Sequence, residues 1–339
     1  MKPQKILYVG NKLAHKGSTA TAIDVLAPRL VEEGFSVISI SDKKNKFMRM
    51  IDMLCTVWMQ ASSSQVVLID TYSTLNFQYA VYTAKICRWK KTPYIPILHG
   101  GNLPNRLKNS SSKSKKLFGN ALINVAPSHY LIDTFKAHGF TNLIHIPNTI
   151  AIDKYAFKLR KNPRARLLWV RSFSEIYNPL LAISVVKELQ QQGLDVSLTM
   201  VGPQKDSSFD ACKQLVETEN LPVTFTGKLE KSQWIKLSEA HDIFINTTNF
   251  DNTPVSVLEA MALGLPVVST NVGGLPFLIN HDVDGVLVSP NSISAFTTAI
   301  NGLLEDPETA QRIARQARQK VEKFDWDVVK QQWISLLSQ

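Results

Sequence analysis

The side chains best suited to chemistry lie in one stretch, from Phe250 to Gly274. Two carboxylates, Asp251 and Glu259, stand on either side of the expected start of a helix near Val255. A helix start offers free backbone N–H groups and the positive end of the helix dipole, which together favour a bound phosphate. Asp251 is then placed to reach sugar hydroxyls, and Glu259, one turn inside, to accept hydrogen bonds from ribose. The alternative is an ordinary amphipathic helix with Glu259 on its solvated face.

Strands and helices that alternate along the chain must position this stretch. Strands are expected at 5–9, 35–40, 65–69, 94–98, 121–125, 143–146, 167–170, 196–201, 223–225, 243–246, 267–269 and 285–288. Helices are expected at 19–33, 46–59, 75–89, 128–137, 179–191, 209–219, 232–240, 255–262, within 292–321, and at 326–337. This alternation predicts an α/β protein with two doubly wound parallel sheets, joined by a polar linker over 152–165. Ligands of such sheets lie beyond the carboxyl ends of the strands.

Composition is that of a folded protein, with 44% apolar and 19% charged residues. The three cysteines, Cys55, Cys87 and Cys212, are far apart and lack metal-ligand spacing, so neither a disulfide framework nor a zinc site is expected. No signal peptide core and no window of about 20 consecutive apolar residues is seen. We therefore expect a cytoplasmic protein.

The charge is distributed unevenly. Residues 1–160 hold 22 Lys and Arg against 8 Asp and Glu, whereas residues 161–339 hold 16 against 20. The basic half is expected to face an anionic partner, such as a membrane surface or a phosphorylated lipid. Charge kept only for solubility is the alternative. A nucleic acid is not expected as a partner, because the basic clusters lack aromatic stacking motifs and a recognition fold.

The stretch from Asp251 resembles the C-terminal signature of the retaining GT-B glycosyltransferases of family 4. That signature is a Glu, seven residues, then Glu-Ala-Met-Ala-x-Gly-x-Pro-Val, a short strand and Gly-Gly. Here Glu259 to Val267 match it, Gly273 and Gly274 follow, and Asp251 stands at the first Glu. The shorter carboxylate predicts an unusual donor choice.

The resemblance extends over nearly the whole chain and assigns residue roles. Arg171, at the end of Leu168 to Arg171, matches the family's Arg that clamps the donor diphosphate, but Tyr177 stands where its partner Lys is expected. An Arg after a strand is otherwise a surface charge. Segments 201–203 and 223–229 match the family segments that flank the nucleoside. They do not distinguish a donor with uracil from one with guanine or adenine. The implied donor-binding set is Gly17, Ser18, Arg171, Tyr177, Gly202, Lys228, Asp251, Thr253, Val255 and Glu259, and the implied catalytic set is His99, Arg171 and Asp251.

The N-terminal half carries two of these matches. Gly17 and Ser18 stand at an expected helix start, where the family has a glycine-rich loop. His99, before Gly100 and Gly101, resembles the family's histidine that contacts the donor sugar. A lone glycine loop and a structural histidine are the respective alternatives.

The resemblance also implies the domain organisation. Residues 1–155 are expected to form the acceptor-side Rossmann-like domain and 156–325 the nucleotide-sugar donor domain, with a central cleft between them. Ile146, Pro147 and Asn148 resemble the family's hinge. Trp326 resembles the aromatic that opens the final helix, so residues 326–339 are expected to pack back on the first domain.

The implied reaction moves a sugar from a nucleoside diphosphate to an acceptor hydroxyl with retention at the anomeric carbon. Arg171, the helix amides near Val255 and the loop at Gly17 are expected to stabilise the charge on the leaving phosphate. No cofactor and no metal are therefore expected to be required. The Asp-x-Asp pair of Asp282 and Asp284 is interpreted as a chance match to a metal-site spacing. No general base is assigned.

The acceptor is expected to be a saccharide or a lipid-linked sugar of cell-envelope polysaccharide or glycolipid synthesis. A basic, aromatic helix over 46–59 follows Lys43 and Lys44 and is typical of a segment resting on an anionic membrane. A helix packed on the sheet with its charges in water is the alternative. A second basic, serine-rich cluster over 106–116 is expected to be a loop over the acceptor site. These features predict peripheral association with the inner face of the membrane.

Other functions compete with this interpretation. A sugar-nucleotide epimerase or a phosphorylase would share the fold, although no motif for the pyridoxal cofactor of a phosphorylase is seen. A non-catalytic GT-B nucleotide-binding module is favoured by the changes at Asp251 and Tyr177.

Overall fold

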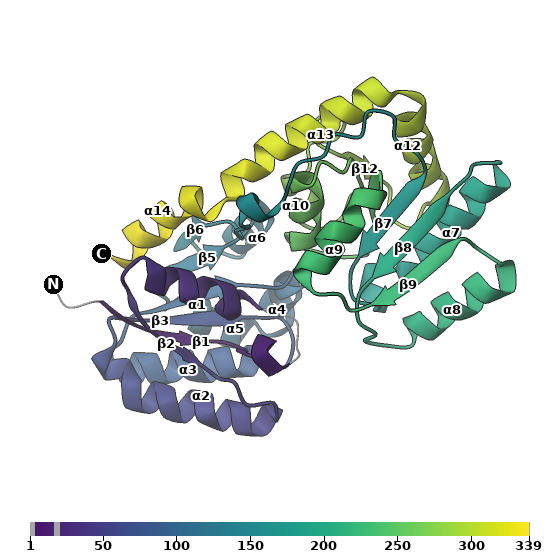
Figure 1. Ribbon diagram of the computed structural model, residues 1–339. Coiled ribbons are helices and arrows are strands. Elements are labelled where there is room, and N and C mark those ends of the chain that lie inside the picture. The colour runs from purple at the N-terminus through teal and green to yellow at the C-terminus, as the bar shows by residue number, and fades with distance from the viewer. Residues whose placement is uncertain (1–3, 17–20, 339) are drawn as a thin grey trace. The chain divides into compact units, whose positions relative to one another are not determined.

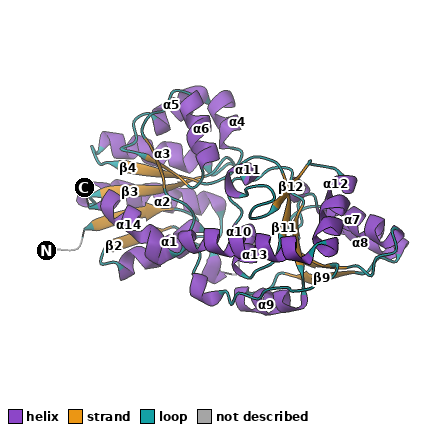
Figure 2. Cartoon of the chain, turned by 90° about the horizontal axis from the view of Figure 1, so that it is seen from above, coloured by secondary structure: helices purple, strands orange, loops and turns teal. Residues whose placement is uncertain are grey.

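The computed structural model describes residues 4–16 and 21–338 (Figure 1). Contacts divide the chain into unit 1, residues 1–147 with 330–339, and unit 2, residues 148–329. The domain boundaries expected from the sequence were 155/156 and 325/326. Each unit holds a parallel sheet with helices on both faces, as Figure 2 shows, so the predicted α/β class with two doubly wound sheets is confirmed.

Unit 1 contains one six-stranded sheet in the order β2-β1-β3-β4-β5-β6. Its strands are β1 (Lys5–Val9), β2 (Ser36–Ile40), β3 (Val66–Thr71), β4 (Tyr94–Leu98), β5 (Asn124–Ala126) and β6 (Leu143–His145). Its helices are η1 (Ala14–Lys16), α1 (Ala22–Glu32), α2 (Lys46–Gln60), η2 (Ala61–Ser63), α3 (Phe77–Trp89), α4 (Leu103–Asn109), α5 (Ser111–Phe118) and α6 (His129–Ala137). Because the order reverses between β1 and β3, ligands are expected beyond the carboxyl ends of this strand pair.

Unit 2 contains the second sheet, in the order β12-β11-β10-β7-β8-β9. Its strands are β7 (Arg166–Val170), β8 (Ser197–Val201), β9 (Val223–Gly227), β10 (Ile243–Asn246), β11 (Val267–Thr270) and β12 (Val286–Val288). Its helices are η3 (Ile152–Lys154), η4 (Glu175–Tyr177), α7 (Pro179–Gln191), α8 (Ser208–Glu219), α9 (Lys231–Leu237), η5 (Ser238–Ala240), α10 (Val255–Ala262), α11 (Leu275–Leu278), α12 (Ile293–Glu305), α13 (Pro307–Val321) and η6 (Glu322–Phe324). The reversal here lies between β7 and β10. The last helix, α14 (Trp326–Leu337), contains the 329/330 boundary.

The basic cluster over 106–116 is not a loop, so that expectation is wrong. It forms α4 and α5, which bury Leu103 and Leu107 in the first helix and Leu117 and Phe118 in the second. Apolar residues at helical spacing therefore outweigh the serine- and lysine-rich composition.

The segment over 152–165 packs on unit 2 instead of forming a free linker. The guanidinium of Arg160, which is buried, donates hydrogen bonds to the carbonyl oxygens of Lys158, Ser238, His241 and Leu263. Burial lowers the pKa of Arg160 to about 10. One side chain thus ties this segment to the end of α10 and to the turn before β10.

We expect Arg160→Ala to lower the free energy of unfolding of unit 2 by about 3 kcal/mol, because it removes the hydrogen bonds that a buried cation donates to four carbonyl oxygens. The corresponding fall in Tm is about 6–12 °C. Arg166→Ala is the control, since Arg166 is bonded to the exposed Asp195 and surface pairs contribute little. Equal Tm values for the two variants in thermal melts would contradict this role of Arg160.

Candidate functional site

The candidate site of unit 2 is built where the strand order reverses. Strands β7 and β10 pair in parallel, with Leu168 opposite Phe244. Arg171 follows the end of β7, and the loop that carries Asp251 follows the end of β10. The central strand pair therefore brings together two residues that are 80 positions apart in the sequence.

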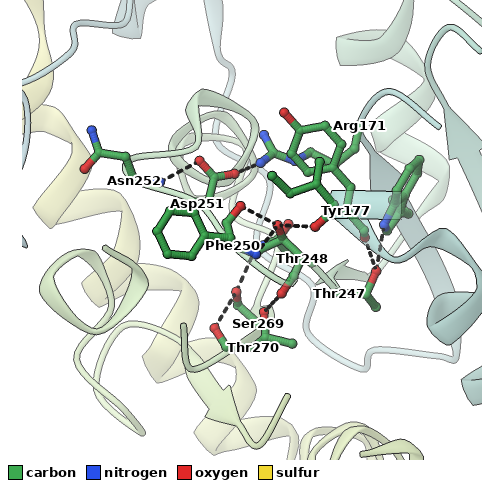
Figure 3. A network of polar contacts seen from close by, with 12 residues as sticks. Arg171, Tyr177, Thr247, Thr248, Phe250, Asp251, Asn252, Ser269 and Thr270 are labelled. Carbon is green, nitrogen blue, oxygen red and sulfur yellow. Dashed lines mark hydrogen bonds and ion pairs between the residues drawn. The ribbon is translucent and has the colours of Figure 1, made fainter. Parts of the chain in front are cut away.

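Arg171 and Asp251 form an ion pair in which both side chains are largely buried (Figure 3). Their exposed fractions are 13% and 17%. The other carboxylate oxygen of Asp251 accepts a hydrogen bond from the backbone N–H of Asn252 at 2.8 Å. Burial lowers the pKa of Arg171 from its ordinary value. The alternative in which Arg171 is an exposed surface charge is wrong.

Tyr177 supports the guanidinium instead of offering a second cation. The Arg171 guanidinium carbon lies 4.1 Å from the centre of the Tyr177 ring, which is a cation–π contact. The segment 175–178 that carries the ring is fixed by the residues after β10. Thr247 Oγ1 donates a hydrogen bond to the carbonyl oxygen of Tyr177 at 3.0 Å (Figure 3). The backbone N–H of Asn249 donates to the carbonyl oxygen of Ile176 at 2.8 Å.

Glycines allow the backbones of both ion-pair residues to pack closely. A Cβ atom at Gly202, whose φ is +154°, would lie 1.8 Å from the carbonyl oxygen of Arg171. A Cβ atom at Gly273 would lie 2.2 Å from the carbonyl oxygen of Asp251, and one at Gly274 would lie 2.0 Å from that of Asn252. These glycines therefore hold Arg171 and Asp251 in place through the backbone.

Glu259 is buried, with an exposed fraction of 3%, so the alternative that places it on a solvated helix face is wrong. Its Oε1 accepts a hydrogen bond from the hydroxyl of Tyr155 at 2.7 Å and forms an ion pair with Lys231. Burial, followed by the nearby carboxylate, raises the pKa of Tyr155. Lys231 opens α9 and is half exposed, so a cation lies between Glu259 and solvent.

Three further polar or exposed groups lie at the start of α10 or just before it. Pro254 at the N-cap supplies no side-chain acceptor. Val255 is the first helical residue and is exposed, whereas Thr253 before it is buried. The hydroxyl of Ser256 is buried and has no hydrogen-bond partner in the described part of the chain. A buried hydroxyl without a partner at a helix start is suited to a polar ligand.

Two other residues singled out by the sequence analysis, Lys228 and Asp284, also lie in unit 2. Lys228 follows the edge strand β9, two strands from β7, and lies 3.9 Å from Glu230. The carboxylate of Asp284 accepts from the backbone of Asn280 and pairs with Lys320, so it serves the packing of α13. Within residues 4–16 and 21–338, no group of three or more His, Cys, Asp or Glu is arranged to hold a metal ion.

Unit 1 places His99 against a fully buried carboxylate. The Nε2 atom of His99 lies 2.8 Å from Oδ1 of Asp70, which also accepts from the hydroxyl of Tyr8 at 2.9 Å. Asp70 lies in β3 and His99 follows β4, its neighbour in the sheet. With Nε2 engaged, Nδ1 is the ring atom that can contact a ligand. The histidine therefore belongs to a polar pair at the carboxyl edge of the sheet.

Tyrosines surround this pair. Burial, followed by the charge of Asp70, raises the pKa of Tyr8, Tyr72 and Tyr79. The hydroxyl of Tyr79 donates to the backbone carbonyl of Asp70 at 2.6 Å. Tyr8 and Tyr79 thus hold Asp70 in place by hydrogen bonds from neutral hydroxyl groups, and neither supplies a positive charge. The predicted residues Gly17 and Ser18 lie outside the described residues.

A hollow of about 540 Å³ opens beyond the carboxyl ends of β1 and β2. Its lining mixes basic and acidic side chains, namely Lys12, His15, Asp24, Asp42 and Asp52. Such a lining suits a polar ligand with hydroxyl groups.

Four residues of these two sites were missed by the sequence analysis, namely Asp70, Tyr155, Lys231 and Ser256. Asp70 had a signal, since it directly follows the apolar run of Val66 to Ile69 and a carboxylate is rarely buried without a partner. Tyr155, Lys231 and Ser256 are recognised only from their surroundings in the folded chain, which no local sequence pattern predicts.

Comparison with known proteins assigns residues 151–320 to a family described as Glycosyl transferases group 1. A sulfoquinovosyl transferase of Arabidopsis thaliana is 35% identical over 109 residues, which are 31% of this chain and 21% of the relative. Glycogen synthase of Mycobacterium tuberculosis is 28% identical over 197 residues, which are 56% of this chain and 47% of the relative. The chain thus matches less than half the length of either relative.

The crystal structure of Anabaena Alr3699/HepE in complex with UDP is similar over 99% of this chain and 100% of that one. The TM-score is 0.80 at 20% sequence identity. This likeness confirms the GT-B architecture expected from the sequence.

Proposed function

Because the chain belongs to the glycosyl transferases group 1 family, we propose that it transfers a sugar from a nucleoside-diphosphate sugar to an acceptor hydroxyl. The observation that carries the proposal is the buried ion pair of Arg171 and Asp251 at the reversal point of the unit 2 sheet. A guanidinium binds a diphosphate, and a carboxylate binds sugar hydroxyls. A nucleotide sugar carries both groups in adjacent positions.

We propose that unit 2 binds the donor. Arg171 and the first turn of α10 bind the diphosphate, with Ser256 as a further hydrogen-bond donor. Asp251 accepts from the transferred sugar, and Glu259 accepts from the ribose hydroxyls. Lys231 then lies next to the ribose through its ion pair with Glu259. UDP is the first nucleotide to test, since the similar Anabaena structure holds UDP.

The proposed transfer retains the configuration at the anomeric carbon. The bond from that carbon to the phosphate oxygen breaks, and negative charge gathers on the leaving diphosphate. Arg171 and the α10 amides stabilise that charge in a largely buried site, where a fixed charge acts strongly. In this mechanism, Arg171 and the α10 amides stabilise the negative charge on the leaving diphosphate, and no metal ion is required. The diphosphate is proposed to accept the proton of the acceptor hydroxyl, and His99 to contact the sugar.

The proposed acceptor is a saccharide or a lipid-linked sugar, in cell-envelope polysaccharide or glycolipid synthesis. The hollow of unit 1 supports this choice, because Lys12, Asp24 and Asp42 offer both donors and acceptors to sugar hydroxyls. The excess of basic residues in the first half of the chain favours an acceptor that carries phosphate.

Thermal melts in the absence of metal test the donor site. We expect one of UDP, GDP, ADP and CMP to raise the Tm, and we expect that rise to be lost in Glu259→Gln, which keeps the shape of the side chain. Tyr177→Phe keeps the ring under Arg171 and should preserve nucleotide affinity. Tyr177→Ala should weaken it by about 2- to 30-fold, the range of a cation–π contact.

Two results would overturn the proposal. No Tm shift with any of the nucleotides would remove the donor site. Nucleotide binding with no sugar transfer or donor hydrolysis would instead indicate a non-catalytic binding module.

A further inference from the structure

Helix α2 is apolar on both of its faces. Its inner side packs Met53 and Val57 into the core of unit 1, as expected for a helix that covers a sheet. Its outer side should then be polar, because a helix that is apolar all round is normally buried. In Figure 1, α2 lies outermost in unit 1, on the opposite side of the sheet from α1.

The outer side of α2 is an apolar stripe instead. It consists of Phe47, Met48, Ile51, Cys55, Trp58 and Met59, which are all exposed. Their spacing places them on about one third of the helix circumference. Phe47 is 72% exposed and Met59 is 66% exposed. No charged residue interrupts the stripe.

Helix α3 extends the apolar surface. Trp89 is 64% exposed and stacks on Trp58, with ring centres 4.4 Å apart and planes inclined by 14°. The ammonium of Lys90 lies 4.5 Å from the centre of the Trp58 ring. The two tryptophans are therefore held as a rigid pair at the surface, with a cation beside them. We call the stripe and Trp89 together the α2–α3 face.

Lysines flank both ends of the α2–α3 face. Lys43, Lys44 and Lys46 precede or open α2 and are exposed, as are Lys85 and Lys91 on the α3 side. A hollow of about 570 Å³ lies at the first end, lined by Lys16, Lys43, Lys44, Asn45 and Met48. Each end of the apolar surface thus carries ammonium groups.

We propose that the α2–α3 face docks on the surface of an anionic lipid bilayer. Apolar and tryptophan side chains enter the boundary between headgroups and acyl chains, while the flanking lysines bind lipid phosphates. The helix then lies in the plane of the membrane and presents about 20 Å of apolar surface to it. No helix of residues 4–16 and 21–338 is long and apolar enough to cross a bilayer.

Charge complementarity favours a bilayer over a second copy of the chain. A symmetric contact between two α2–α3 faces would bring lysine ends close to lysine ends or leave their charges without partners. An anionic bilayer supplies both an apolar acyl-chain region for the stripe and negatively charged headgroups for the lysines. This proposal goes beyond sugar transfer and does not depend on it.

Cys55 allows a direct test, because it is exposed on the stripe while Cys87 and Cys212 are buried. Burial raises the pKa of each buried thiol to about 12, so thiol-reactive reagents should modify Cys55 selectively. We would attach an environment-sensitive fluorophore to Cys55 of the full chain. We expect a blue-shifted, stronger emission with phosphatidylcholine vesicles that contain phosphatidylglycerol, and little change with phosphatidylcholine alone.

Vesicle sedimentation supplies the affinities. The triple variant Lys43→Gln, Lys44→Gln, Lys46→Gln should bind anionic vesicles at least about 10-fold more weakly, and Trp58→Ser with Trp89→Ser should weaken binding by a similar factor. The triple variant Lys205→Gln, Lys213→Gln, Lys236→Gln, at three exposed lysines of unit 2, is the matched charge control. For the fluorophore, Cys55→Ser with Leu122→Cys moves the label to an exposed apolar position of unit 1 outside the α2–α3 face.

Three outcomes would overturn the proposal. The first is no binding to anionic vesicles by the wild-type chain. The second is an equal emission change from the label at position 122. The third is an emission change that grows with protein concentration in the absence of vesicles, which would assign the α2–α3 face to a second copy of the chain.

Discussion

Replacing Arg171 by alanine is expected to lower kcat/KM for sugar transfer by about 10²–10³-fold, the usual loss when a preorganised partner of developing charge is removed. The expectation rests on the burial of the guanidinium and on its fixed position above the Tyr177 ring. Arg171 need not reorganise when charge gathers on the leaving diphosphate. Initial rates with the donor found in the nucleotide screen measure the effect.

A double-mutant cycle with Asp251 separates catalysis from packing. Arg171→Ala leaves the Asp251 carboxylate largely buried without its partner, which by itself destabilises unit 2. Arg171→Ala with Asp251→Ala should recover part of that stability in thermal melts and none of the transfer rate. Recovery of both would mean that the pair only supports the fold.

Asp70→Asn is expected to lower kcat/KM by about 10- to 100-fold, because the ring of His99 loses the carboxylate that orients it. The change keeps the size of the side chain but replaces the anion that accepts from Nε2 at 2.8 Å. Asp70 is proposed to act through His99, so Asp70→Asn with His99→Ala should be no slower than His99→Ala alone. Steady-state kinetics of the three variants provide this comparison.

Tyr8→Phe is the matched control for Asp70. It removes the other hydrogen bond to Oδ1 of Asp70 and leaves the contact with His99. It should cost about 1 kcal/mol of stability and change the transfer rate little. If Tyr8→Phe slowed transfer as much as Asp70→Asn, general loosening of the buried cluster would explain both effects.

The sequence was most informative where the site is local. Asp251, Glu259 and the two glycines after β11 lie in one stretch, and its helix runs over the predicted residues 255–262. Arg171 was assigned from the family resemblance, which has an Arg after this strand, and the ends of parallel strands meet at one edge of the sheet. The fold class followed from the same alternation of strands and helices.

Contacts between distant segments could not be predicted. Tyr155 lies 104 residues before Glu259, and Lys231 lies 28 residues before it. Tyr177 was placed in the donor-binding set at the position of the family's Lys, and its ring contact with Arg171 exists only in the folded chain. Helices α4 and α5 were taken for a loop because four buried apolar residues, which composition alone does not reveal, stabilise them.

The ion pair of Arg171 and Asp251 gives the proposed donor site its own internal counter-ion. Donor binding is then an exchange, in which the diphosphate replaces Asp251 on Arg171 and the sugar hydroxyls replace Arg171 on Asp251. Only an intact nucleotide sugar supplies both replacements. After transfer, the nucleoside diphosphate leaves Asp251 without a partner, so re-formation of the internal pair competes with the product. The pair would thereby favour binding of the donor and release of the spent nucleotide.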